Sequence, residues 1–168
     1  AQYVTTFSST QRFNEGSWSA YYNPDDCYTS YYNGIYAAHD YLDKSVDYRY
    51  ILGMHRDTLT SNGLESYRRD IVDVQRLRAE AHVLKAYYYF ELLRHYGPFV
   101  VMDENIDPGV PVVDMKKERS PVDVCVEEIV SLLDEAMKDL PLMKDKERSR
   151  WAYHSLASAA ALKAMTLF

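Results

Sequence analysis

YYYFELLRHYGP, residues 87–98, is the stretch of sequence that decides the fold of this chain. Arg94 and His95 place positive charge at the carbonyl end of a helical pattern, where it suits the helix dipole. Gly97 can take the left-handed cap conformation, and Pro98 prevents another helical turn. The stretch therefore predicts the C-terminal end of a helix.

Apolar residues at helical spacing extend this helix upstream over residues 64–96, with Ser-Asn-Gly at 61–63 as the predicted break before it. They form two stripes: Val74, Leu77, Ala81, Leu84, Tyr88, Leu92 and Tyr96 in one, and Val83, Ala86, Phe90 and Leu93 in the other. A helix with two apolar stripes is covered from both sides. Because three consecutive tyrosines spread around a helix, most of residues 87–89 are predicted to pack in the core or against other helices, and not to form a ligand platform.

Two helices are predicted before the long one. The first opens at Asp25 or Asp26, either of which can cap backbone N–H groups, and a shorter piece follows at about 48–55. Spacings of three and four define the apolar face of the first helix. This face consists of Tyr28, Tyr32, Ile35, His39, Leu42 and Val46.

Two more helices are predicted after it. Ser120 as cap, Pro121 as first helical residue and Asp123 in the first turn start one helix, which Pro141 stops. Its apolar face consists of Val122, Val126, Ile129, Leu133, Ala136 and Leu140. A charged link at 144–150 precedes the last helix, whose predicted small-residue face consists of Ala157, Ala161, Ala164 and Phe168.

The predicted fold class is all-α, with tetratricopeptide-like helical hairpins of the α-solenoid type. Residues 99–102 form a short extended run and 107–111 are loop-like, so no true sheet is expected. A strict tetratricopeptide repeat of about 34 residues is absent. The predicted organisation is an irregular aromatic segment at 1–24 and a helical domain at 25–168. Because the last helical pattern reaches Phe168 without a stop signal, the chain is expected to end before the protein does.

Composition narrows the possible partners. The 168 residues carry a formal net charge of −6, and the basic residues are scattered, which excludes a typical nucleic-acid-binding protein. The 16 tyrosines suit partly solvent-exposed surfaces, because each offers an apolar ring and a polar hydroxyl. Such surfaces either contact sugars or other polar ligands, or pack between helices beside solvent. Cys27 and Cys125 are predicted to be two free, buried thiols in preference to a disulfide. No signal peptide or membrane-spanning run is visible, and the start at Ala1 is typical of a processed or trimmed product.

Several blocks, in the same order along the chain, resemble the SusD/RagB family. The blocks are RAEAHVLKAYYYFELLRHYGP at 78–98, GVPVV at 109–113, RSPVD at 119–123, residues 129–141, and Arg150 with residues 157–168; residues 32–42 resemble the preceding helix. The resemblance covers roughly 28–168. It departs from the family at His39, where asparagine is usual, at Lys85, where arginine is usual, and at Met165, where arginine is common.

The resemblance implies a truncated SusD-like fold from a longer protein. It further implies a surface-exposed lipoprotein of the outer membrane of Bacteroidota that serves polysaccharide utilisation. Such a protein binds oligosaccharide or polysaccharide without catalysis and passes it to a TonB-dependent, SusC-like transporter, which the helices are thought to contact. Membrane attachment would be only through a lipid anchor absent from this chain. No cofactor is expected. A peptide-binding RagB-like member and a helical-repeat scaffold that binds only a protein partner are the alternatives.

Trp18 is the favoured residue for ligand contact. A sugar ring buries its apolar face on an aromatic plane, while polar side chains at the rim bind its hydroxyls. The resemblance implies sugar-contacting aromatics in this stretch. The candidate site consists of Trp18, Tyr21, Tyr22, Phe13, Asn14, Asn23 and Asp25. The alternative, that Trp18 packs on the helices, stays equally open.

Catalytic and metal sites are disfavoured by the sequence. Glu91 and His95 stand four residues apart on one helix face, but with no third ligand an ordinary contact between neighbouring turns is the preferred interpretation. A weak calcium-loop pattern consists of Asp103, Asn105, Asp107 and Asp114, with Pro108 where such loops need glycine. No motif of a hydrolase, zinc protease, nucleotide-binding or dinucleotide-binding enzyme occurs, and no carboxylate pair for glycan cleavage can be nominated.

Overall fold

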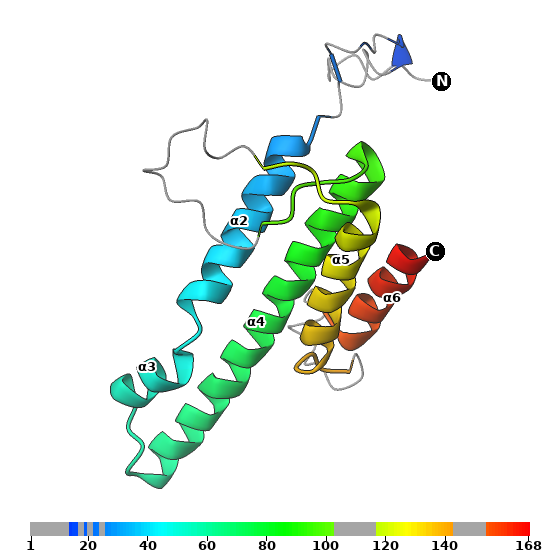
Figure 1. Ribbon diagram of the computed structural model, residues 1–168. Helices are drawn as coiled ribbons and strands as arrows, with labels where there is room; N and C mark the ends of the chain where they lie inside the picture. The colour runs from blue at the N-terminus through cyan, green and yellow to red at the C-terminus, as the bar shows by residue number, and fades with distance from the viewer. Residues whose placement is uncertain (1–13, 17–18, 20–21, 24–25, 103–116, 143–153) are drawn as a thin grey trace, which may run out of the picture. The chain divides into compact units, whose positions relative to one another are not determined.

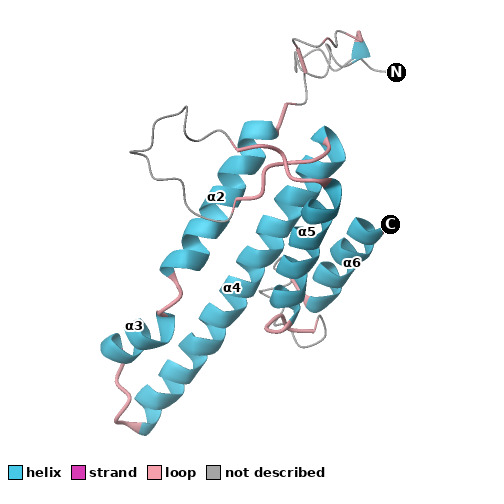
Figure 2. Ribbon diagram, in the orientation of Figure 1, coloured by secondary structure: helices cyan, strands magenta, loops and turns pink. Residues whose placement is uncertain are grey.

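The structure is a computed structural model that describes residues 14–16, 19, 22–23, 26–102, 117–142 and 154–168. Five helices make up the fold of this described part (Figures 1 and 2). In chain order they are α2 (Tyr28–Lys44), α3 (Tyr48–His55), α4 (Ser61–Tyr96), α5 (Val122–Met137) and α6 (Leu156–Leu167). Within those residues no strand occurs apart from one isolated antiparallel bridge between Ser19 and Tyr22. The predicted all-α class is confirmed. The chain divides into two compact units, residues 1–30 and 31–168.

The start of α4 differs from the prediction, because the Ser-Asn-Gly break is the first helical turn. The Thr60 hydroxyl accepts a hydrogen bond from Gly63 N at 3.2 Å and caps the helix. The Asp57 carboxylate accepts hydrogen bonds from Leu59 N and Thr60 N at 2.9 and 3.2 Å. A Cβ at Gly63 would lie 2.3 Å from the Asp57 carbonyl oxygen. The glycine therefore permits this close approach and does not interrupt the helix.

The end of α4 confirms the prediction. Gly97 has a φ of 73°, and its N–H donates to the Leu93 carbonyl at 3.1 Å. Side chains with a Cβ adopt this conformation only with strain, which explains the glycine.

Helix α4 is the central element, as predicted, but two residues of the first predicted apolar stripe, Leu77 and Leu84, are 40% and 38% exposed and do not pack against a neighbouring helix. Helix α2 and the short α3 lie along one side of α4, α5 packs on the other, and α6 packs on α5 (Figure 1). The Arg78 guanidinium on α4 joins this helix to α2 by donating to the Leu42 carbonyl at 2.7 Å. The largest fully buried side chains are Ile35, Val83, Tyr89, Leu92, Phe99, Cys125, Ile129 and Leu133.

Two predicted details of α5 are wrong. Pro121 is the N-cap and not the first helical residue, and the Ser120 side chain does not cap the helix. Ser120 N instead donates to the Phe99 carbonyl at 2.8 Å, which ties the start of α5 to the segment that follows α4. The helix ends at Met137, before Pro141.

The predicted small-residue face of α6 does not pack against another helix within the described part of the chain. All four of its members, Ala157, Ala161, Ala164 and Phe168, are exposed. The buried positions are Ser155, at the cap, and Ala159 and Leu162 in the helix. The face that meets α5 is the one that carries Leu162, because burial of a leucine removes more apolar area from water than burial of an alanine.

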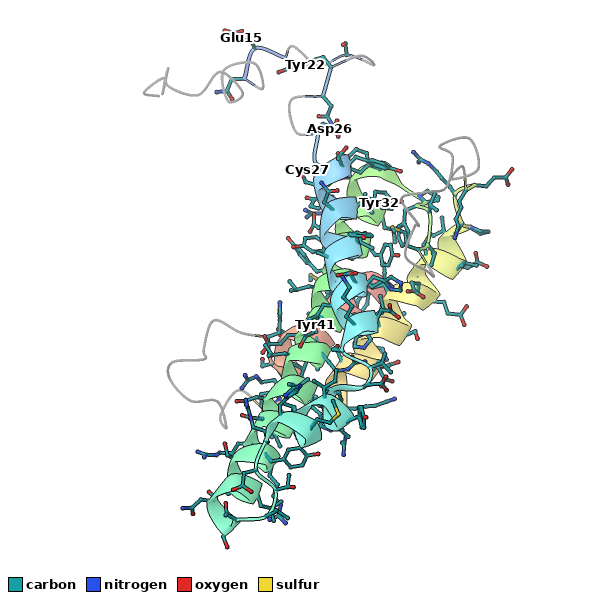
Figure 3. All side chains as sticks on the ribbon, turned by 90° about the vertical axis from the view of Figure 1, so that its left-hand side faces the viewer. Glu15, Tyr22, Asp26, Cys27, Tyr32 and Tyr41 are labelled. Atoms are coloured by element: carbon teal, nitrogen blue, oxygen red, sulfur yellow. The ribbon has the colours of Figure 1, made fainter. Side chains whose placement is uncertain are left out.

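A short extended segment, residues 99–102, follows α4, and two of its backbone N–H groups donate to tyrosine hydroxyls. Val100 N donates to the Tyr32 hydroxyl oxygen at 3.0 Å, and that hydroxyl donates to the Val100 carbonyl at 3.2 Å (Tyr32 is labelled in Figure 3). Met102 N donates to the Tyr89 hydroxyl oxygen at 2.9 Å. Buried backbone polar groups need partners, and here side chains of α2 and α4 replace the neighbouring strand of a sheet.

Candidate functional site

Three of the predicted ligand-contacting residues, Asn14, Tyr22 and Asn23, lie within the described residues, and all three are exposed. Ser19 and Tyr22 exchange two backbone hydrogen bonds of 3.1 Å (Tyr22 is labelled in Figure 3). The other four, Phe13, Trp18, Tyr21 and Asp25, lie outside the described residues, as do the calcium-loop residues Asp103, Asn105, Asp107 and Asp114. The ligand site around Trp18 therefore stays a prediction.

Glu91, near the end of α4, is a buried carboxylate with three partners on its own helix. Arg94 Nη2 lies 2.6 Å from Glu91 Oε2, and His95 Nε2 lies 3.7 Å from the same oxygen. Burial raises the pKa of the Tyr87 hydroxyl, and the charge of Glu91 and a hydrogen bond to it raise that pKa further. The arginine is the nearer partner, so the carboxylate is neutralised within one turn of helix. The contact between Glu91 and His95 is therefore the expected one between neighbouring turns, but the expectation that it is solvated is wrong, because Glu91 is buried and Arg94 joins it as an unpredicted partner.

The three consecutive tyrosines divide as predicted into mainly packing roles. The Tyr89 ring is fully buried and stacks on Phe99 with centroids 4.6 Å apart. Tyr88 lies against α2, where a Cβ at Gly34 would come within 2.5 Å of its ring and the Tyr31 ring centroid is 6.1 Å away. Tyr87 is exposed. Two of the three are therefore core or helix–helix contacts.

Lys85 is a buried residue whose role the helical pattern did not reveal. The residue is only 5% exposed. Lys85 Nζ lies 3.8 Å from Glu128 Oε1 on α5, and it donates to the Met102 carbonyl at 3.4 Å. It also lies 5.8 Å from the Tyr89 ring centroid. One cation thus joins α4, α5 and the segment that leads into residues 103–116. The sequence held one indication of this role, because Lys85 stands where arginine is usual in the resembled family.

His82, on α4, is the described histidine with the clearest electrostatic perturbation. Burial lowers the pKa of its imidazole, and the positive charge of Arg78 lowers it further, while the carboxylate of Glu135 on α5 opposes these effects. Its Nδ1 atom is buried without a hydrogen-bond partner among the described residues. The protein therefore favours the neutral form of this side chain.

Metal and thiol chemistry find little support in the described part of the chain. No group of three histidine, cysteine, aspartate or glutamate side chains there is arranged to hold a metal ion. Cys27 and Cys125 are not joined by a disulfide, as predicted, but only Cys125 is buried, whereas Cys27 is half-buried. None of the helices described is both long and apolar enough to span a bilayer.

Comparisons with known proteins agree with this architecture. Residues 2–167 match the SusD-like family described as "Starch-binding associating with outer membrane". The solved structure of BT4246 is 26% identical, with a TM-score of 0.67 over 96% of this chain and 24% of that one. A SusD-like protein of Bacteroides fragilis NCTC 9343, BF3747, is 22% identical, with a TM-score of 0.66 over 92% and 26%.

The chain thus spans about a quarter of the length of these two solved structures. The likeness to BF3747 concerns the fold alone. No curated protein gives a significant match.

Proposed function

Because this chain belongs to the SusD-like family, we propose that it forms the helical part of a cell-surface protein that captures an oligosaccharide for import. The protein binds its ligand without chemical conversion and passes it to a TonB-dependent, SusC-like transporter in the outer membrane. The observation that carries the proposal is the family match over residues 2–167. The exposed side chains of Tyr22, Asn14 and Asn23 support it, because they offer an aromatic surface and amide groups for a sugar.

Retardation in native gels that contain soluble polysaccharide tests glycan binding. Starch is the first glycan to use, followed by other plant and microbial glycans. We expect the protein to be retarded by at least one of them, and Trp18→Ala or Tyr22→Ala to reduce the retardation. Tyr36→Ala is the matched control, because Tyr36 on α2 is 42% exposed and Tyr22 is 37% exposed. If all the variants were retarded equally, the aromatic segment would not be part of the glycan-binding site.

The other outcomes discriminate between the remaining classes. Binding of peptides but of no glycan would indicate a RagB-like member. Binding of a protein partner alone, unchanged by Trp18→Ala, would indicate a scaffold. Release of shorter sugars from a polysaccharide that is incubated with the purified protein would contradict the non-catalytic role.

The transporter and the membrane anchor need an experiment in cells. We expect the native protein to co-purify from outer membranes with a TonB-dependent transporter. We also expect it to partition as a lipoprotein at the cell surface. Recovery in the soluble fraction, with no transporter attached, would contradict both.

A further inference from the structure

His82 lies on the face of α4 that α5 covers. It stands one helical turn before Lys85 and two turns before Tyr89, so the three side chains share this face. Lys85 Nζ lies 3.8 Å from Glu128 Oε1 on α5, and Tyr89 is fully buried. The Nδ1 atom of His82 is itself buried and has no hydrogen-bond partner among the described residues. The imidazole is therefore held at the α4–α5 interface with one of its nitrogens shielded from solvent.

Positive groups dominate the surroundings of this imidazole. The charges that act on it are those of Arg78 and Lys85 on α4 and of Glu135 and Lys138 on α5. The single carboxylate among the four, that of Glu135, already forms an ion pair with Lys138. A protonated His82 would add a fourth positive charge to this group. Like charges at a partly buried helix contact repel each other and are screened less than on an open surface.

The charged groups that α2 and α6 bring near this interface are already engaged. Lys163 of α6 forms an ion pair with Asp134 of α5. On the other side, His39 Nδ1 of α2 lies 3.5 Å from Lys85 Nζ. The imidazole of His39 can also titrate, so it is the second histidine for which an experiment in acid needs a control.

A positive charge on His82 conflicts with the closed interface for two physical reasons. Besides the repulsion, both nitrogens of an imidazolium are donors, so the buried Nδ1 would carry an N–H without an acceptor. In water the same side chain is charged without either penalty. A state in which α5 moves away from His82 therefore gains population as the pH falls. The lowered pKa of His82, caused first by burial and then by the charge of Arg78, agrees with this direction.

Helix α2 is attached to α4 by other contacts, which do not involve α5. The Tyr88 ring lies against Gly34 of α2, and Arg78 donates to a carbonyl of that helix at 2.7 Å. The start of α6 is tied to the segment after α5, because Leu156 N donates to the Pro141 carbonyl at 3.1 Å. An opening at His82 thus involves α5 and α6 together and leaves the α2–α4 pair intact.

We propose that mild acid opens the α4–α5 interface locally, because protonation of His82 releases the C-terminal half of α5 from α4 while α2 stays packed. Local opening of this kind needs less free energy than unfolding of the whole domain. The inference goes beyond the proposed function and does not rest on it, because it concerns no residue of the candidate ligand site.

Hydrogen–deuterium exchange of the purified protein, followed by mass spectrometry, tests the proposal at about pH 7.5 and pH 5.5, on either side of the ordinary histidine pKa. Labelling times are adjusted for the intrinsic pH dependence of amide exchange. In acid we expect the protection of residues 130–142 to fall by about fivefold or more, which corresponds to about 1 kcal/mol. Residues 31–44, in α2, should keep their protection.

Variants at two positions assign the effect to His82. His82→Gln cannot take up a proton, so the protection of residues 130–142 should be the same at both pH values. His55→Gln, at an exposed histidine of α3, is the matched control and should behave like the unaltered protein. Glu135→Gln removes the carboxylate that favours the charged imidazole, so the fall in protection should grow. Glu127→Gln, at another exposed glutamate of α5, should leave it unchanged.

Three outcomes would overturn the proposal. Equal loss of protection in α2 and α5 would mean that acid unfolds the whole domain. A response that persists in His82→Gln but disappears in His39→Gln would assign the effect to the contact of His39 with Lys85. Unchanged protection of residues 130–142 in acid would show that the closed interface accommodates a charged His82. If circular dichroism shows that His82→Gln does not fold, the comparison of Glu135→Gln with Glu127→Gln decides, and equal responses of these two variants would count against the proposal.

Discussion

The hydroxyl of Tyr89 carries a specific and measurable share of the stability of this protein. Tyr89→Phe keeps the fully buried ring and its stack on Phe99, and it removes only the oxygen that accepts the Met102 N–H at 2.9 Å. The N–H is left without that partner in the core, which costs about 1–3 kcal/mol. For a chain of this length, about 2–4 °C of melting temperature is lost per kcal/mol.

Two further tyrosines calibrate the measurement. Tyr32→Phe removes both hydrogen bonds to Val100, but that site is only part-buried, so water can replace them and the loss should be smaller than for Tyr89→Phe. Tyr36→Phe, at a position on α2 that is 42% exposed, should change the free energy of unfolding by less than about 0.5 kcal/mol.

Urea unfolding followed by circular dichroism gives the free energy of unfolding for each variant. We expect the urea midpoint to be highest for Tyr36→Phe, lower for Tyr32→Phe and lowest for Tyr89→Phe, with an unchanged denaturant slope. A Tyr89→Phe protein as stable as Tyr36→Phe would refute the reasoning. It would show that the backbone of residues 99–102 finds other partners at no cost.

Four further predictions concern single positions and use the same unfolding assay. Gly34→Ala should destabilise the protein by about 1–3 kcal/mol, because the new Cβ would collide with the Tyr88 ring at 2.5 Å. Gly53→Ala should have the opposite sign, with a gain of about 0.5–1 kcal/mol and a higher melting temperature, because the Cβ meets no atom. Gly97→Ala should cost about 1 kcal/mol, since the φ of 73° strains any residue with a Cβ, and an unchanged midpoint would contradict the role of the cap. The fold lowers the pKa of His82, so the folded state prefers the neutral imidazole. This contribution to the free energy of unfolding is complete above pH 6.5, the ordinary pKa, and declines as the pH falls below it. His82→Gln should therefore flatten the stability–pH curve in this acidic range.

Residues close together in the sequence determined the helices and the end of α4. Helical spacing, the basic last turn, and the Gly97–Pro98 pair depend on interactions within a few residues, so they could be interpreted without the fold. The same local information misplaced the start of α4. Residues 61–63 resemble a break in isolation, but the Thr60 side chain caps them as a first helical turn, and Asp57 packs closely beside Gly63.

For the candidate ligand site, the sequence predicted the residue types but not which of these residues lie together. Aromatic and amide side chains before the first helix indicate sugar binding by their chemistry, and the family match supports the same class of function. Which of them converge on one ligand depends on the path of the backbone, which composition does not encode. The structure describes Asn14, Tyr22 and Asn23 alone of that set, and the role of Trp18 stays a prediction.

The sequence by itself determined the all-α class, the central two-sided helix and the resemblance to a family of surface binding proteins. Only the tertiary structure decided that Lys85 is buried beside Glu128, that Tyr32 and Tyr89 accept hydrogen bonds from residues 99–102, and that Tyr50, Ile51 and Met54 of α3 are exposed. The physical reason is the distance along the chain. Helix formation depends on neighbours three and four residues apart, whereas burial and hydrogen-bond pairing depend on residues tens of positions away.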